Sequence, residues 1–178
     1  MLFKYVNIDG LNIFYREAGK ETAPKLVLLG GFPASTHQYR NLIPALADRF
    51  HVVSPDYPGF GNSDMPDPAK FSYTFDNTAS ILEKFLNRVG FTRFGLYVQD
   101  YGGPVGFRIV GRHPEWLEWF IISEHQCLRD RLYAGMGRAS QQLLENPQRG
   151  VGKGNWRVSR ARDRQGRLHH GASQSGVN

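Results

Sequence analysis

The chain predicts an α/β fold with a mostly parallel sheet, and two patterns lead to this prediction. Short apolar runs alternate with segments of helical periodicity along residues 1–122. A hairpin signal precedes the first predicted helix. Strands that alternate with helices are typical of a parallel sheet with helices on its faces. Ligands of such sheets bind at the carboxyl ends of the strands, so functional residues are expected in the loops that follow.

Hydrophobic periodicity and turn residues predict the order of the elements. Asp9-Gly10 lies between two alternating segments, as in a two-residue hairpin. Pro44 falls in the first turn of a predicted helix, where proline is tolerated, and Gly90 ends a later one. In chain order we expect strands over 4–9, 11–16 and 25–29, a helix over 42–50, a strand at 52–53, a helix over 78–89, a strand over 94–98, a helix over 105–112 and a strand over 116–122.

Charge and composition divide the chain into two parts. Residues 126–178 carry ten Lys and Arg against three Asp and Glu, whereas residues 1–125 carry twelve basic and thirteen acidic residues. The second part is rich in Gly, Arg, Gln and Ser and shows no hydrophobic periodicity. We therefore expect a partial domain over 1–125 and a basic, disordered tail over 126–178.

Composition also narrows the compartment and the partners. The single cysteine, Cys127, excludes an internal disulfide and suits a reducing compartment. The N-terminal residues include no long apolar stretch, so we expect a cytoplasmic protein without signal peptide or membrane contact. No histidine pair has metal-ligand spacing on a predicted helix, and we expect neither metal nor cofactor. The arginines in 157–167 could bind nucleic acid through its phosphates. We favour another explanation of this cluster, that it is solvated or out-of-frame sequence without a nucleic-acid partner.

The most informative stretch is residues 94–103, with the sequence FGLYVQDYGG. A predicted buried strand is followed by Asp100, and Gly102 and Gly103 precede a predicted helix. A polar side chain on a sharp strand-to-helix turn has the geometry of a nucleophile elbow. Because this side chain is a carboxylate, it predicts attack on a carbon that bears a leaving group, through an ester intermediate. The alternative is that Asp100 caps the helix; we favour the nucleophile.

Three motifs, each after a predicted strand, then occur in a definite order: Gly30-Gly31-Phe32-Pro33, DYPGFGNS over 56–63, and VQDYGG over 98–103. With them, residues 1 to about 125 resemble the α/β-hydrolase fold family, in its epoxide hydrolase and haloalkane dehalogenase branch. The resemblance implies that the first motif is the oxyanion loop and the third the nucleophile elbow. We expect the three loops to surround one crevice.

The resemblance also implies a two-step hydrolysis of a small-molecule substrate. Asp100 would attack an sp³ carbon of an epoxide or alkyl halide and form an alkyl-enzyme ester. Water activated by a histidine paired with a carboxylate would then hydrolyse the ester. The backbone N–H groups of Phe32 and Tyr101 would hold the oxyanion in that step.

The chain departs from this family at three points. Gly30 stands where the family usually has a histidine that braces the loop. Tyr101 stands where dehalogenases usually have tryptophan, whose indole N–H can hold halide, which favours epoxides mildly. Finally, no helical cap, late strand, late acid or catalytic histidine is evident, because His169-His170 lies in a polar run without a preceding strand.

These departures lead to two expectations of different kinds. The first is an incomplete hydrolase core, truncated or frameshifted after about residue 125, that is weakly active or inactive because it lacks a base for ester hydrolysis. The second is a non-catalytic binding protein whose arginine-rich tail contacts nucleic acid or an acidic partner. Formation of a covalent adduct on Asp100 separates the two.

Overall fold

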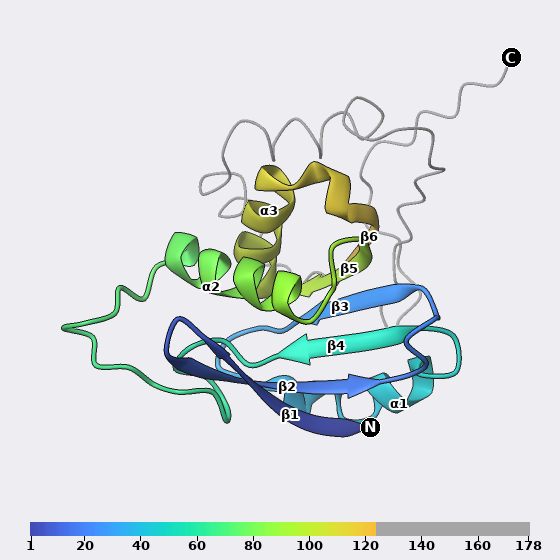
Figure 1. Cartoon of the computed structure of the whole chain (residues 1–178), viewed down its shortest axis with the longest axis horizontal. Helices are drawn as coiled ribbons and strands as arrows, with labels where there is room; N and C mark the ends of the chain where they lie inside the picture. Colours follow the sequence, from blue (N-terminus) through green and yellow to red (C-terminus); the bar gives the residue numbers. More distant parts are fainter. Residues whose placement is uncertain (124–178) are drawn as a thin grey trace, which may run out of the picture.

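The computed structural model describes residues 1–123, which form a six-stranded sheet with helices on both of its faces (Figure 1). The basic segment predicted over 126–178, with Cys127 and the pair His169-His170, lies outside these residues. The strands are β1 (Leu2–Ile8), β2 (Leu11–Ala18), β3 (Lys25–Leu29), β4 (His51–Pro55), β5 (Phe94–Gln99) and β6 (Leu117–Ser123). The helices are η1 (Thr36–Tyr39), α1 (Leu42–Leu46), α2 (Phe75–Arg88), α3 (Gly102–Arg112) and η2 (Pro114–Trp116), of which η1 and η2 are 3₁₀ turns.

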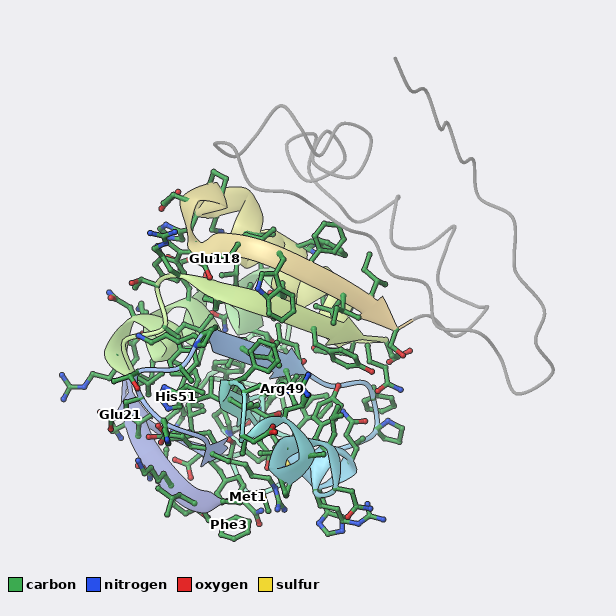
Figure 2. All side chains as sticks on the ribbon, turned by 90° about the vertical axis from the view of Figure 1, so that its right-hand side faces the viewer. Met1, Phe3, Glu21, Arg49, His51 and Glu118 are labelled. Carbon is green, nitrogen blue, oxygen red and sulfur yellow. The ribbon has the colours of Figure 1, made fainter. Side chains whose placement is uncertain are left out.

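The strand order across the sheet is β1-β2-β4-β3-β5-β6. The first hairpin pairs antiparallel with itself and with β4, whereas β4, β3, β5 and β6 run parallel to one another. The predicted α/β architecture with a mostly parallel sheet and an N-terminal hairpin is therefore confirmed for residues 1–123. Figure 2 shows Met1 and Phe3 at one edge of this sheet and Glu118 at the other.

Local sequence signals account for most of the element boundaries. Asp9 and Gly10 both have positive φ, at 51° and 87°, as a type I′ hairpin turn requires. Helix α2 begins after Thr74, whose side chain accepts a hydrogen bond from the backbone N–H of Asn77, and Gly90 follows its end with φ 76°.

One predicted helix is wrong in length. The segment expected to be helical over 42–50 forms only the short helix α1, Leu42–Leu46. Asn41 gives this helix no side-chain cap, and the N–H of Ala47 already bonds to the carbonyl of Pro44 in a tighter turn. Phe50 lies beyond the helix and packs on Trp119, with ring centroids 5.6 Å apart, so its apolar character reflects tertiary packing rather than helical periodicity.

The core has two parts, one on each face of the sheet. The larger part packs α2 and α3 against the sheet, with Leu82, Phe85 and Leu86 fully buried. The smaller part packs α1 against the opposite face, around Ile43. Within residues 1–123, no helix has both the length and the apolar character needed to cross a bilayer.

Candidate active site

Three loops meet at the carboxyl ends of the strands, because the strands that precede them are parallel. We call this side of the sheet the carboxyl edge. Gly30 follows β3, Asp56 follows β4 and Asp100 follows β5. The register pairs Leu29 at the end of β3 with Val98 near the end of β5, so the loops that follow start beside each other. Hydrogen bonds join the loop after β3 both to the loop after β5 and to the loop after β4.

Asp100 occupies a sharp turn between β5 and α3. Its φ is 49°, in the left-handed region that few residues other than glycine adopt, although aspartate tolerates it better than most. The following Gly102 lies directly on β3, and a Cβ there would overlap the carbonyl oxygen of Leu29. The absence of a side chain at Gly102 therefore lets α3 begin in contact with the sheet and keeps the turn tight.

The Asp100 carboxylate is held through one of its oxygens. Oδ1 accepts hydrogen bonds from the backbone N–H groups of Phe32, at 3.0 Å, and Tyr101, at 2.7 Å. Oδ2 has no hydrogen-bond partner within residues 1–123. A Cβ at Gly31 would lie 2.7 Å from the Cβ of Asp100, so glycine is required for this close approach of the two loops.

The helix-cap alternative for Asp100 does not match this arrangement. The N-cap of α3 is Tyr101, and it makes no side-chain cap hydrogen bond. The Asp100 carboxylate instead bonds to one N–H of its own turn and to one from a loop 68 positions away in the chain. The two N–H groups are the same two that the family resemblance assigns to the oxyanion.

Asp56 has a different environment at the same edge. It is only 2% exposed, and both of its carboxylate oxygens are used: Oδ1 accepts from the N–H of Thr36 at 2.6 Å, and Oδ2 from the N–H of Asn62 at 2.9 Å. The hydroxyl of Ser63 donates to the backbone carbonyl of Asp56 at 2.7 Å. Asp56 therefore joins the loop after β3 to the loop after β4.

Aromatic side chains surround the nucleophile candidate. Phe60 packs edge-on against Phe32 with ring centroids 5.9 Å apart, and it also contacts Tyr101 at 5.2 Å. Phe75, at the start of α2, contacts Tyr101 at 4.7 Å. Phe32 itself is 67% exposed, which leaves an apolar ring open beside Asp100. These rings form an apolar cluster around the two segments whose N–H groups bond to Asp100.

Two residues of this edge, Tyr57 and Gln38, were not predicted from the sequence. The phenol of Tyr57 donates a hydrogen bond to the carbonyl oxygen of Gly30 at 2.9 Å. The side-chain amide of Gln38 occupies the space that a Cβ at Gly30 would need. Tyr57 lies 27 positions after Gly30, and Gln38 folds back onto Gly30 from η1, so no local pattern predicts either contact. The one available signal is that Tyr57 directly follows Asp56 within a recognised motif.

The described histidines are all engaged elsewhere. His37 bonds to Arg16, His51 bonds to Glu17 at 2.6 Å, and His113 contacts Glu83 of α2 and Glu115 of η2. None of the three has a hydrogen bond to Asp100. Across residues 1–123, no group of three His, Cys, Asp or Glu side chains could hold a metal ion.

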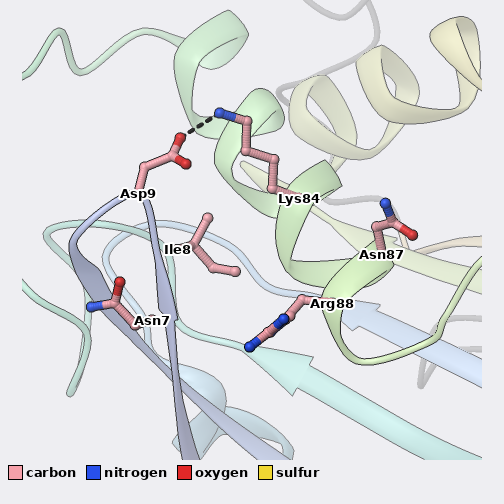
Figure 3. Close-up of a pocket in the computed structure, with 6 residues that line it drawn as sticks. All are labelled: Asn7, Ile8, Asp9, Lys84, Asn87 and Arg88. Carbon is pink, nitrogen blue, oxygen red and sulfur yellow. Dashed lines mark hydrogen bonds and ion pairs between the residues drawn. The ribbon is translucent and has the colours of Figure 1, made fainter.

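A surface hollow of about 500 Å³ lies apart from these loops, between the tip of the first hairpin and α2. Its lining is Asn7, Ile8, Asp9, Lys84, Asn87 and Arg88. Figure 3 shows Lys84 reaching from α2 to Asp9, with which it forms an ion pair. None of the predicted site residues lines this hollow, so it is not part of the candidate site.

A strand-to-helix elbow that presents a polar side chain to two convergent N–H groups, above a mostly parallel sheet, defines the α/β-hydrolase class. The model of the alpha/beta hydrolase fold family matches residues 24–118. The chain belongs to this family.

Individual relatives show which branch the chain resembles. An uncharacterized hydrolase of Saccharomyces cerevisiae is 44% identical over 124 residues, which cover 70% of this chain and 42% of that protein. A haloalkane dehalogenase of Bradyrhizobium diazoefficiens is 34% identical over 115 residues, 65% of this chain and 36% of that protein. The structure of the epoxide hydrolase CorEH superposes with a TM-score of 0.62 and 30% identity, covering 68% of this chain and 41% of that one. The chain thus spans about two fifths of the length of these relatives.

Proposed function

We propose that this hydrolase domain uses Asp100 as a nucleophile toward an electrophilic sp³ carbon, of an epoxide in the first place and of an alkyl halide in the second. The observation that carries the proposal is that the two oxygens of the Asp100 carboxylate have different hydrogen bonding. Oδ1 accepts two backbone N–H hydrogen bonds, whereas Oδ2 has none from residues 1–123. The oxygen that is held stays in place, and the oxygen that is free attacks.

The first step forms an ester between Asp100 and the substrate carbon. An electron pair of Oδ2 makes the new C–O bond while the bond to the leaving group breaks. Halide departs with the electron pair of that bond, whereas an epoxide oxygen remains on the substrate as an alkoxide and takes a proton from water. The cluster of Phe32, Phe60 and Tyr101 supports this step as an apolar surface for the carbon skeleton of the substrate, since the backbones of Phe32 and Tyr101 bond to Asp100.

The second step hydrolyses the ester at the carboxyl carbon of Asp100. Water attacks that carbon and gives up a proton, and negative charge develops on Oδ1, the oxygen that already faces the N–H groups of Phe32 and Tyr101. The bond between the carboxyl carbon and Oδ2 then breaks, Oδ2 leaves with the product as an alcohol that takes up that proton, and the oxygen of the water stays in Asp100. Each such donor is worth about 3 kcal/mol of transition-state stabilisation in related acyl chemistry. The base that activates this water must come from outside residues 1–123, because the three histidines described there are bound elsewhere.

The order of substrate preference rests on Tyr101. Its ring packs among Tyr57, Phe60 and Phe75, and it offers no indole N–H of the kind that the family resemblance assigns to halide. An epoxide keeps its leaving oxygen attached and needs no halide site. The strain of the epoxide ring also supplies part of the driving force for its opening. Epoxides therefore need less stabilisation of the leaving group from this chain than alkyl halides do.

The test is covalent trapping followed by mass spectrometry. The 178-residue chain is incubated with styrene oxide or 1-bromobutane, and the intact mass and the peptide carrying residue 100 are measured. We expect one substrate-sized adduct on Asp100, formed faster with the epoxide, and no adduct on that peptide in Asp100→Asn, because the amide is a far weaker nucleophile. Release of the adduct in ¹⁸O-labelled water should place one ¹⁸O atom in Asp100.

Absence of any adduct on Asp100 with both probes would overturn the proposal. The non-catalytic alternative predicts that result together with salt-sensitive retention on DNA. An adduct that forms but persists for hours would keep the first step and show that the second lacks its base.

A further inference from the structure

We infer that Tyr57 is a positioning residue that fixes both oxyanion N–H donors relative to Asp100. The inference rests on the proposed function of Asp100 and goes beyond it, because Tyr57 does not touch the carboxylate through any hydrogen bond. It acts through the two backbone segments that do. One segment contains Gly30 and Phe32, and the other contains Tyr101.

The first link is the hydrogen bond from the Tyr57 phenol to the Gly30 carbonyl, 2.9 Å long. Gly30 is two residues before Phe32, whose N–H bonds to Asp100. The family resemblance assigns a bracing histidine to position 30, and glycine has no side chain with which to brace the loop. The phenol of Tyr57 holds this segment from outside, and the Gln38 amide occupies the space beside Gly30.

The second link is aromatic packing. The Tyr57 ring lies 5.3 Å from the ring of Tyr101 and 5.2 Å from that of Phe60. Phe60 in turn contacts both Tyr101 and Phe32. A single side chain from the loop after β4 therefore supports the loop after β3 through its hydroxyl and the elbow through its ring.

The setting of Tyr57 suits a permanent hydrogen-bond donor. The residue is only 3% exposed, so its geometry is fixed by packing. Burial, with a smaller contribution from nearby tyrosines and carboxylates, raises the pKa of the phenol well above its ordinary value. The hydroxyl therefore keeps its proton, and its bond to Gly30, at every pH at which Asp100 is a nucleophile.

Tyr39 offers a matched control. It is also 3% exposed, and its phenol also donates to a backbone carbonyl, that of Leu29, at 3.1 Å. Leu29 is the last residue of β3, already fixed by the sheet, and the Tyr39 ring contacts Tyr97 instead of Tyr101. Replacement of either tyrosine by phenylalanine removes one buried hydroxyl and keeps the ring.

The experiment compares Tyr57→Phe with Tyr39→Phe in the 178-residue chain. Hydrogen exchange of the Phe32 amide is followed by NMR after ¹⁵N-phenylalanine labelling, and adduct formation on Asp100 is timed with styrene oxide. For Tyr57→Phe we expect Phe32 exchange about tenfold faster and adduct formation about tenfold slower, since small misplacements of a reactive group carry penalties of at least this size. For Tyr39→Phe both rates should stay within about twofold of the parent chain. Unfolding by urea should show similar losses in the two variants, since each loses one buried hydrogen bond.

Two outcomes would overturn the inference: unchanged Phe32 exchange in Tyr57→Phe, or equal changes in both variants. If the parent chain forms no adduct at all, the proposed function fails, and Phe32 exchange alone still decides the role of Tyr57. If Tyr57→Phe does not fold, meta-fluorotyrosine at position 57 replaces that variant: fluorine makes the phenol a stronger donor to the Gly30 carbonyl, so Phe32 exchange should become slower than in the parent chain, and unchanged exchange would overturn the inference.

Discussion

Asp56 and Asp100 lie in neighbouring loops at the same edge of the sheet, and each accepts two backbone N–H hydrogen bonds, yet they are used in opposite ways. Asp56 accepts one bond on each oxygen, and it is almost fully buried. Asp100 accepts both bonds on Oδ1 and is only partly buried. The first carboxylate has no oxygen left for a ligand, whereas the second keeps one free.

If Asp100 is the nucleophile we propose, this difference explains how one fold uses the same residue type for bracing and for chemistry. Where both oxygens of a carboxylate accept hydrogen bonds from the backbone, moving or modifying either oxygen breaks one of these bonds and lowers the free energy of unfolding. A carboxylate held through one oxygen can change at the other without releasing its loop. Substitutions should therefore affect the Asp56 loop mainly in stability and the Asp100 loop mainly in reactivity.

The largest effect is expected at Gly61, whose backbone lies against Asp56. Its φ is 51°, and a Cβ there would overlap Oδ2 of Asp56. Gly61→Ala should lower the free energy of unfolding by about 3 kcal/mol, from the backbone conformation and the overlap together. Gly90→Ala is the control, because Gly90 has φ 76° with open space around it and should lose only about 1 kcal/mol. Urea denaturation measures both, and equal losses would mean that the contact with Asp56 does not matter.

The second effect compares the same substitution at the two carboxylates. Asp56→Asn replaces one accepting oxygen by an NH₂ group, which leaves the N–H of Thr36 or Asn62 without its partner, and should cost about 2 kcal/mol of unfolding free energy. Asp100→Asn keeps an oxygen that accepts from Phe32 and Tyr101, and should change stability by less than about 0.5 kcal/mol while it abolishes the adduct. Similar stability losses for the two variants would contradict the distinction between a brace and a nucleophile.

Much of this arrangement could be predicted from the sequence because its signals are local. The turn at Asp9-Gly10, the strand over 25–29 and the elbow strand before Asp100 are each marked by residues adjacent in the chain. The parallel order then brings the loops after β3, β4 and β5 to one edge, so grouping Asp100 with Phe32 followed from topology alone.

The features that were missed depend on contacts between distant segments. The overlong helix at 42–50 arose because Phe50 is apolar for packing against Trp119, nearly 70 positions later, and not for a helix face. The bond from Tyr57 to Gly30 and the fit of Gln38 against Gly30 require the folded loops to be in place. Which oxygen of Asp100 is free is likewise a property of the loop geometry and not of the motif.

The smallest effect concerns a carboxylate held by side chains instead of backbone. Glu17 accepts from Lys4 and from His51, each at 2.6 Å, and burial opposes its ionisation, but these two hydrogen bonds outweigh burial and lower its pKa below the ordinary value of 4.5. Because the pKa is lower in the folded state, the stabilisation is fully present above pH 4.5 and is lost as the pH falls through the folded-state pKa. The free energy of unfolding of the parent chain minus that of Glu17→Gln should therefore be about 1 kcal/mol larger at pH 6 than at pH 3. Taking the difference between the parent chain and Glu17→Gln cancels the pH dependence that the two proteins share. A difference that stays constant with pH would show that Glu17 contributes by shape and packing instead of by its charge.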